Sequence, residues 1–197
     1  MTPSPKIFDP YAARFARARA AKRQAKTGAS FLFIRAAQDA ASRLLDINRQ
    51  FARVVMVGQV DGRADILREL PLDRQPDNFD YVTDVQALAG TYDVILSLLE
   101  LQSDEALPET LAAFRQHLNA DGLLLAATFG GDTLTELRQS LYGADQQVLG
   151  GATARVYPMV DYSQAAMLLG RVGLALPVVD ADKVTVHYGA LSSLIGD

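Results

Sequence analysis

The sequence predicts an α/β fold in which a mostly parallel sheet is covered by helices on both faces. Short apolar segments rich in β-branched residues alternate with segments of helical period, and strands separated by helices run parallel. The last two strand candidates are joined only by Asp180-Ala-Asp182, which is too short for a crossover. We therefore expect the sheet to finish in an antiparallel hairpin.

The composition excludes several classes of protein. The chain has 197 residues, of which 49% are hydrophobic and 21% charged, as expected for one domain with a sizeable core. The absence of cysteine excludes disulfides, thiolate zinc sites and thiol nucleophiles. No apolar run reaches the roughly 18 residues of a membrane span. We also expect no secretory signal, because the first residues lack its apolar core.

The net charge of −4 is unevenly distributed along the chain. Residues 1–53 carry 11 Lys and Arg against 3 Asp and Glu, whereas residues 54–197 carry 8 against 20. Asp9 followed by Pro10 predicts the start of a basic helix that runs to Gly28. This helix is either simply solvated or contacts phosphates, an anionic membrane surface or an acidic partner, and its composition also resembles a transit peptide. Nucleic acid is the least favoured partner because the acidic body repels phosphate.

The first elements after this arm are a helix, a strand and a second, short helix. Ser30 is a predicted N-cap, and the apolar residues that follow it have the 3.6-residue period of a helix packed on a sheet. The β-branched run from Arg53 to Gly58 predicts a buried parallel strand. A short helix is predicted from Gly62 to Leu70 and ends at Pro71.

The remaining elements repeat this alternation up to the final hairpin. Pro108 is predicted to open a helix, and the pair Thr133 and Glu136 to form a capping box before another. Asn119-Ala-Asp-Gly122 is a predicted turn. The expected strands cover residues 79–83, 92–97, 123–128, 174–179 and 184–188, and a further helix covers residues 163–172.

Ligands of an open parallel sheet bind beyond the carboxyl ends of its strands. Those ends are predicted at the loop from Gly58 to Gly62, at Asp84 and at residues 97–102. Glycine lets a cofactor approach the backbone, and an acid at a following strand end can hold ribose hydroxyls. The pattern G-x-x-x-G is weak, because Val60 replaces a central glycine, and a tight turn without a ligand explains it equally well.

Other catalytic patterns are nearly absent from the sequence. His117 and His187 are predicted to be surface residues without a triad around them, and no spacing of His, Asp and Glu predicts a metal site. The stretch Gly130-Gly131-Asp132 precedes a helix and presents backbone amides suited to an anion. A capped turn is the interpretation that we favour for it.

The second half contains two specific motifs. Residues 129–138 read F-G-G-D-T-L-T-E-L-R, and residues 150–158 read G-G-A-T-A-R-V-Y-P. Both resemble the class I S-adenosylmethionine-dependent methyltransferase-like proteins of α-proteobacteria and mitochondria. The mitochondrial member of that group assists assembly of respiratory complex I and hydroxylates an arginine. The closing residues 175–188 and the opening Ile7-Phe8-Asp9 resemble the group as well, so the resemblance covers almost the whole chain.

The resemblance implies a Rossmann-like methyltransferase sheet over residues 51–197, with the basic N-terminal helices of residues 1–50 packed on the core. It implies S-adenosylmethionine as cofactor. The residues expected to hold it are Gly58, Gln59, Gly62 and Asp84.

The departures from the family fall on its chemistry. The family's cofactor loop, D-L-G-C-G-T-G, is here M-V-G-Q-V-D-G, and its His-Trp pair is Gln102-Ser103. Between Gly62 and Tyr92 one strand–helix unit is missing, which leaves open whether Asp84 matches the ribose-binding acid or the adenine-contacting one.

Two functions are compatible with these residues. The first is a methyltransferase-like enzyme, possible even without acid–base residues because methyl transfer needs mainly alignment. The second is an inactive paralogue that acts as a binding or assembly factor through its basic helix. Either way we expect a protein partner or acceptor, no nucleic acid, no metal, and a cytoplasmic protein that contacts membranes at most peripherally.

Overall fold

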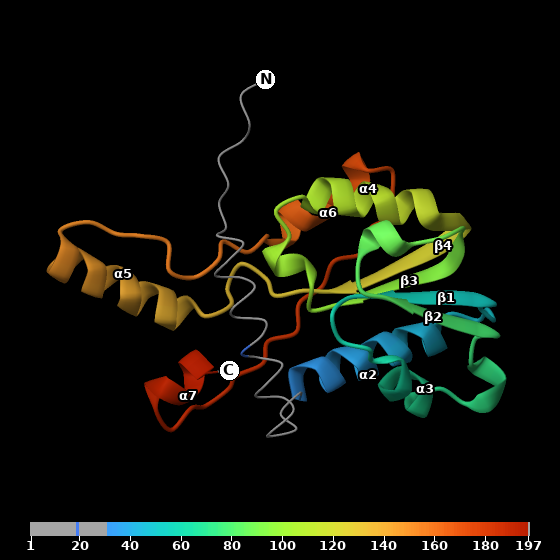
Figure 1. Cartoon of the computed structure of the whole chain (residues 1–197), viewed down its shortest axis with the longest axis horizontal. Helices are drawn as coiled ribbons and strands as arrows, with labels where there is room; N and C mark the ends of the chain where they lie inside the picture. The colour runs from blue at the N-terminus through green and yellow to red at the C-terminus, as the bar shows by residue number, and fades with distance from the viewer. Residues whose placement is uncertain (1–18, 20–30, 197) are drawn as a thin grey trace.

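The protein folds around a four-stranded parallel sheet in the order β2-β1-β3-β4. The computed structural model describes residue 19 and residues 31–196, and element labels follow Figure 1. The strands are β1 (Arg53–Val57), β2 (Asn78–Val82), β3 (Tyr92–Leu98) and β4 (Leu118–Ala127). The α/β fold, its parallel strands and the positions of the first three strands are confirmed.

Helices cover both faces of this sheet (Figure 1). On one face lie α2 (Phe31–Asp46) and α3 (Arg63–Glu69), and on the other lie α4 (Leu107–His117) and α6 (Tyr162–Arg171). Alternate side chains of the strands therefore enter two apolar cores. Val54 and Met56 pack with Ala41 of α2, whereas Val55 and Ile95 belong to the core that contains Phe114 of α4.

One carboxylate fastens the strand starts together. Asp93, near the start of β3, accepts hydrogen bonds from the backbone amides of Ala52 and Arg53 at 2.9 and 3.0 Å and from the side chain of Asn119 at 2.9 Å. The amide of Arg53 is the main cause of the lowered pKa of Asp93, ahead of Asn119. The preceding segment and the starts of β1 and β4 are thus tied to β3.

The connections between strands are unequal. α3 and the short 3-10 helix η1 (Leu72–Arg74) link β1 to β2, and η3 (Leu101–Ser103) and α4 link β3 to β4. Between β2 and β3, which lie on opposite sides of β1, the chain forms only η2 (Val85–Ala87). The sheet accordingly has no strand and helix between β2 and β3, as expected from the missing unit.

The predicted antiparallel hairpin is wrong. Residues 174–188 form neither helix nor strand, and β4 pairs only with β3 among the described residues. The carboxylates of Asp180 and Asp182 instead pair with Arg43 and Arg35 of α2, at 2.9 and 2.6 Å. These ion pairs hold the segment against α2, and Leu176, which the hairpin would have placed in a strand, is 92% exposed.

Two smaller predictions fail for local reasons. The helix α5 (Thr135–Leu149) begins after Leu134 and has no side-chain cap, so the capping box of Thr133 and Glu136 does not form. The stretch 119–122 lies inside β4 as an irregularity in its pairing with β3, and Asp121 has a φ of 59° there. Conversely, α6 has a capping box of Asp161 and Gln164 that the sequence analysis did not identify.

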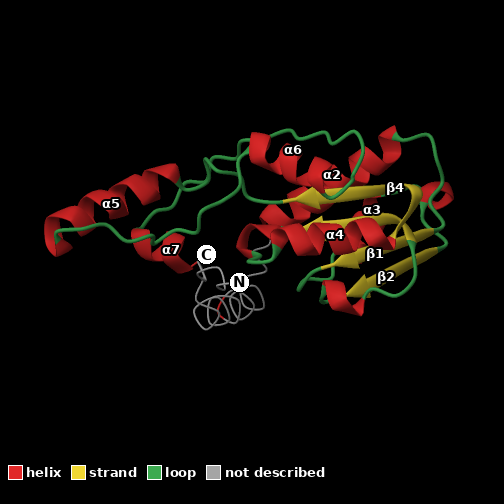
Figure 2. Cartoon of the chain, turned by 90° about the horizontal axis from the view of Figure 1, so that it is seen from above, coloured by secondary structure: helices red, strands yellow, loops and turns green. Residues whose placement is uncertain are grey.

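The segment after β4 leaves the sheet. α5 and α7 (Leu191–Gly196) lie to one side of the α/β body in both cartoon views (Figures 1 and 2). The predicted apolar side of α5 is not buried, and its only buried residue is Asp145. The predicted basic helix from Asp9 to Gly28 lies outside the described residues apart from Arg19. Within the described part of the chain, no helix is long and apolar enough to span a membrane.

Candidate functional site

The loop that follows β1 lies at the carboxyl edge of the sheet, as predicted. We call residues 58–62 the glycine loop. The amide of Gly58 donates to the carbonyl of Val82 at the end of β2, at 3.1 Å, and Gly62 is the N-cap position of α3. Leu99, just after β3, donates to the carbonyl of Ala127 at the end of β4, at 2.7 Å. The ends of all four strands therefore meet at one edge.

Glu100 reaches across this edge into the glycine loop. Its Oε1 accepts a hydrogen bond of 2.7 Å from the backbone amide of Gln59. A Cβ atom added to Gly58 would lie 2.8 Å from Cγ of Glu100, closer than carbon atoms pack. The close approach that requires glycine at position 58 is thus made by the protein's own glutamate. The Gln59 side chain turns toward β2, where its Nε2 donates to the carbonyl of Thr83 at 2.8 Å.

Gly62 faces the helix α2 instead of the carboxyl edge. A Cβ atom at this position would lie 2.5 Å from the ring of Phe33. The Gly62 amide is also occupied, because it donates to the sulfur of Met56 at 3.2 Å in a buried contact. The second glycine of the loop is accordingly required by the packing of α2 on the start of α3.

Asp61 of the glycine loop belongs to a charged and aromatic cluster with Arg63 and Tyr81. Asp61 and Arg63 form an ion pair of 2.9 Å, and Arg63 also donates to the carbonyl of Phe79 and lies over the ring of Tyr81, 5.6 Å from its centroid. Hydrogen bonding to Arg63 lowers the pKa of Asp61. Burial raises the pKa of the Tyr81 phenol, with further contributions from the negative charges of Asp61 and Glu100.

The remaining predicted residues lie at the same edge but serve local contacts. Asp84 follows β2, and its carboxylate caps η2 by accepting from the amide of Gln86 at 3.0 Å. Gln102 donates to the carbonyl of Leu99 at 2.6 Å and accepts from the hydroxyl of Thr128 at 3.3 Å. Gly58, Gln59 and Asp84 are thus near the strand ends, and the hydrogen bond of the Asp84 carboxylate is the local one to Gln86.

Glu100, Asp61, Arg63 and Tyr81 were not singled out by the sequence analysis, which gave only the range 97–102 for the end of β3. The available signal for Glu100 was its place directly after that strand. Arg63 and Tyr81 carried no signal, because their contact depends on how β2 lies beside the loop.

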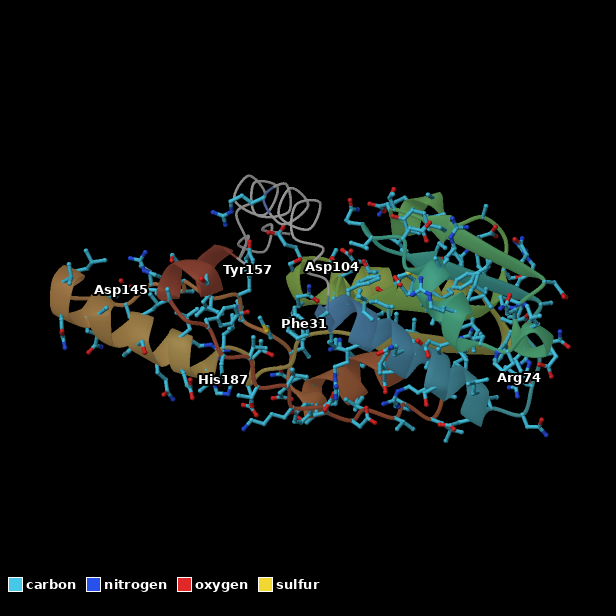
Figure 3. The ribbon with its side chains drawn as sticks, turned by 90° about the horizontal axis from the view of Figure 1, so that it is seen from below. Phe31, Arg74, Asp104, Asp145, Tyr157 and His187 are labelled. Atoms are coloured by element: carbon cyan, nitrogen blue, oxygen red, sulfur yellow. The ribbon has the colours of Figure 1, made fainter. Side chains whose placement is uncertain are left out.

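The other candidate groups, the two histidines and a small apolar hollow, lie apart from the glycine loop. His187 is exposed, whereas His117 is half-buried and its Nδ1 lies 2.6 Å from the carbonyl of Gly90. No cluster of three or more His, Asp and Glu residues suited to a metal occurs in the described residues. A small apolar hollow is lined by Phe51 and Arg74, among others, at the amino ends of β1 and β2. The hollow is therefore at the opposite end of these strands from the glycine loop, and Figure 3 shows Arg74 far from Asp104 of the segment after β3.

Comparison with known proteins shows which proteins part of this chain resembles. No family model matches the chain. The chain is 36% identical over 108 residues to the human mitochondrial arginine-hydroxylase NDUFAF5, and 37% identical over 109 residues to the malonyl-[acyl-carrier protein] O-methyltransferase of Laribacter hongkongensis. Each match covers 55% of this chain and 31% and 35% of the relative, respectively, so the chain spans about a third of the length of these curated relatives.

Solved structures agree with these relatives at the level of the fold. The plantazolicin methyltransferase BpumL, solved with a desmethylPZN analogue and S-adenosylhomocysteine, aligns with 82% of this chain and 71% of its own, with a TM-score of 0.53 and 13% identity. The chain is thus similar to class I S-adenosylmethionine-dependent methyltransferase-like proteins in part of its sequence and in its fold. The expected Rossmann-like methyltransferase fold is confirmed, without the antiparallel hairpin.

The glycine loop of this methyltransferase-like protein can be tested for its fit to the family's cofactor. S-adenosylmethionine carries a carboxylate, and the Gln59 amide is a donor that already bonds a carboxylate, that of Glu100. The donor chemistry therefore fits. The space beside Gly58 is filled by Glu100 and that beside Gly62 by Phe33. Both side chains are half-buried, but only that of Glu100 is long and flexible.

Proposed function

We propose that this chain is a methyltransferase-like protein that binds S-adenosylmethionine at the carboxyl edge of β1, β2 and β3. The observation that carries the proposal is the backbone amide of Gln59, which follows the central strand β1 and bonds a carboxylate at 2.7 Å. Gly58 and Gln59 would hold the carboxylate end of the cofactor. Asp84, at the end of β2, is the nearest predicted acid for the ribose, once it releases the amide of Gln86.

When bound, S-adenosylmethionine supplies an electrophilic methyl group, and the protein has to hold the acceptor in line with it. Asp61 of the glycine loop, with Arg63 and Tyr81, offers a carboxylate, a guanidinium and a hydroxyl for positioning. The methyl acceptor stays open. The assignment to respiratory complex I assembly rests on the family resemblance alone, and a protein acceptor or partner is proposed on the same ground.

A second function is favoured by a different observation. Phe33 and Glu100 fill the space beside both glycines, which is the arrangement expected of a paralogue that acts by binding a partner without a cofactor. In that case the basic N-terminal arm is the proposed contact with an acidic protein or with the surface of a membrane. A cytoplasmic location belongs to this proposal as well.

Titration calorimetry of the purified chain with S-adenosylhomocysteine separates the two functions. The enzyme proposal predicts saturable heat that Gly58→Arg abolishes, because the new side chain has to occupy the space beside the Gln59 amide. Gly143→Arg is the matched control, since a Cβ atom at Gly143 meets nothing within 4 Å, and it should bind as the parent does.

Thermal unfolding of both variants shows whether they are folded. Saturable binding that Gly58→Arg removes and Gly143→Arg retains supports the enzyme. If the folded parent gives no heat with millimolar S-adenosylhomocysteine, the enzyme proposal is contradicted. The function as a binding protein without a cofactor then remains.

A further inference from the structure

Glu100 stands out among the polar groups of the strand edge because it is an internal ligand. Its carboxylate comes from beyond β3 and accepts a backbone hydrogen bond from the glycine loop, 41 residues earlier in the chain. Its Cγ is the atom nearest to the space beside Gly58. The Glu100 side chain thus fills the space beside Gly58, and its carboxylate takes the amide that a small anion would otherwise bind.

The backbone next to Glu100 holds this arrangement in place. Leu99 has a φ of 56°, in the left-handed region that is unfavourable for a residue other than glycine. Its amide is nevertheless fixed by the 2.7 Å bond to Ala127, and its carbonyl accepts from Gln102 at 2.6 Å. The chain therefore turns sharply as it leaves β3, and this turn directs Glu100 back over β1.

We propose that Glu100 is a built-in occupant of the glycine loop, so that a carboxylate-bearing ligand binds only after displacing it from the Gln59 amide. This inference deepens the proposed function and rests on it for the identity of the natural ligand. The occupancy itself is a property of the loop and can be tested with a simpler anion.

Glu100 and a ligand carboxylate compete for the same hydrogen-bond donor. The Gln59 amide is a single donor, and a charge-assisted bond to it is available either to Glu100 or to an incoming carboxylate. Removing Glu100 frees the donor and also removes a like charge from the site. A ligand carboxylate should then bind about tenfold more tightly, which is the effect of one such bond.

Two variants of Glu100 separate occupancy from charge. Glu100→Ala removes both the carboxylate and its stem, whereas Glu100→Asp keeps the charge and withdraws the carboxylate by one methylene. The control is Glu109→Ala, an exposed glutamate in the first turn of α4, which makes the same change of net charge.

The first measurement follows the Gln59 amide by NMR while malonate, a small dicarboxylate, is added to the 197-residue chain. We expect malonate to shift this resonance in Glu100→Ala and Glu100→Asp but not in the parent or in Glu109→Ala. Equal shifts in the parent and in Glu100→Ala, or no shift in any of them, would overturn the inference. A shift in Glu100→Ala with none in Glu100→Asp would mean that charge repulsion, and not occupancy of the amide, excludes malonate. This result would also overturn the inference.

The second measurement is calorimetric titration of the same proteins with S-adenosylhomocysteine. About tenfold tighter binding in Glu100→Ala supports both the inference and the proposed function. Equal affinity in the parent and Glu100→Ala contradicts the inference alone. If malonate binds to Glu100→Ala but S-adenosylhomocysteine binds to none of the proteins, the inference stands and the proposed function fails.

Discussion

At the scale of single residues, glycine is required at the two positions of the loop for different reasons. Gly58 leaves room for the side chain of Glu100, which bonds the Gln59 amide, whereas Gly62 leaves room for the ring of Phe33, which is part of the packing between α2 and α3. A glycine pattern after a strand is therefore no measure of ligand binding until the atoms that occupy the missing side chain's space are identified.

The role of Gly62 can be tested by substitution. Gly62→Ala should lower the free energy of unfolding by about 1–3 kcal/mol, because its Cβ would lie 2.5 Å from Phe33 and the packed ring has to shift. In a Phe33→Leu background the same change should cost less, by at least about 0.5 kcal/mol. Urea unfolding of the four proteins measures both values.

Gly143→Ala is the control for the Gly62 experiment. Its Cβ meets nothing within 4 Å in the middle of α5, so the change should be neutral or slightly stabilising. Additive effects of Gly62→Ala and Phe33→Leu would show that the ring does not determine the glycine, and would return Gly62 to the list of ligand-binding candidates.

The sequence predicted which residues follow the strand ends, but not the contacts that these residues make. The positions of Gly58, Gln59 and Asp84 followed from strand ends, which a local apolar run is enough to predict. The contact from Glu100 depends on the strand order β2-β1-β3 and on the left-handed turn at Leu99, and neither is encoded in a short window of sequence.

At the scale of elements, the buried residue of α5 is a carboxylate with polar contacts, where an apolar face was expected. Asp145 is only 5% exposed and accepts hydrogen bonds from the hydroxyl of Thr153 at 2.8 Å and from Arg155 at 2.9 Å. This cluster closes the segment after α5 back onto the helix. The motif residue Arg155 thus has a structural partner in α5.

The Asp145 cluster gives a prediction for pH. Hydrogen bonding to Arg155, and then to Thr153, lowers the pKa of Asp145 from 3.8 to about 2. Because the folded-state pKa is depressed, the contribution of this carboxylate is complete above pH 3.8 and is lost as the pH falls toward 2. The amide resonance of Thr153 should therefore titrate with a midpoint near 2.

Asp145→Asn should abolish the titration of Thr153 and increase hydrogen exchange at residues 150–155, while the amides of β1 and β3 keep their protection. Asp132→Asn, at an exposed position before α5, should change neither. A Thr153 midpoint at the ordinary value of 3.8 would show that the ion pair is not formed in solution.

At the scale of the whole molecule, the core and the final third of the chain differ in how they are stabilised. The inner strands are buried on both faces, and their apolar runs were sufficient to predict them. Residues 174–188 have the alternation of a strand but lie against α2, where Arg35 and Arg43 pair with Asp182 and Asp180. A segment with an alternating pattern forms a strand only when a neighbouring strand is available to pair with it. The alternation in the sequence does not specify that neighbour.

Hydrogen exchange of backbone amides tests this division directly. No amide of residues 175–187 donates to a backbone oxygen of another described residue, whereas the amides of β3 lie between two strands. Amides such as Ile95 should therefore exchange only by global unfolding, with protection of at least about 10³-fold, and those of residues 175–187 within about tenfold of an unstructured peptide. Protection of alternate amides from Val184 to His187 at the level of Ile95 would instead mean that an antiparallel strand forms in solution.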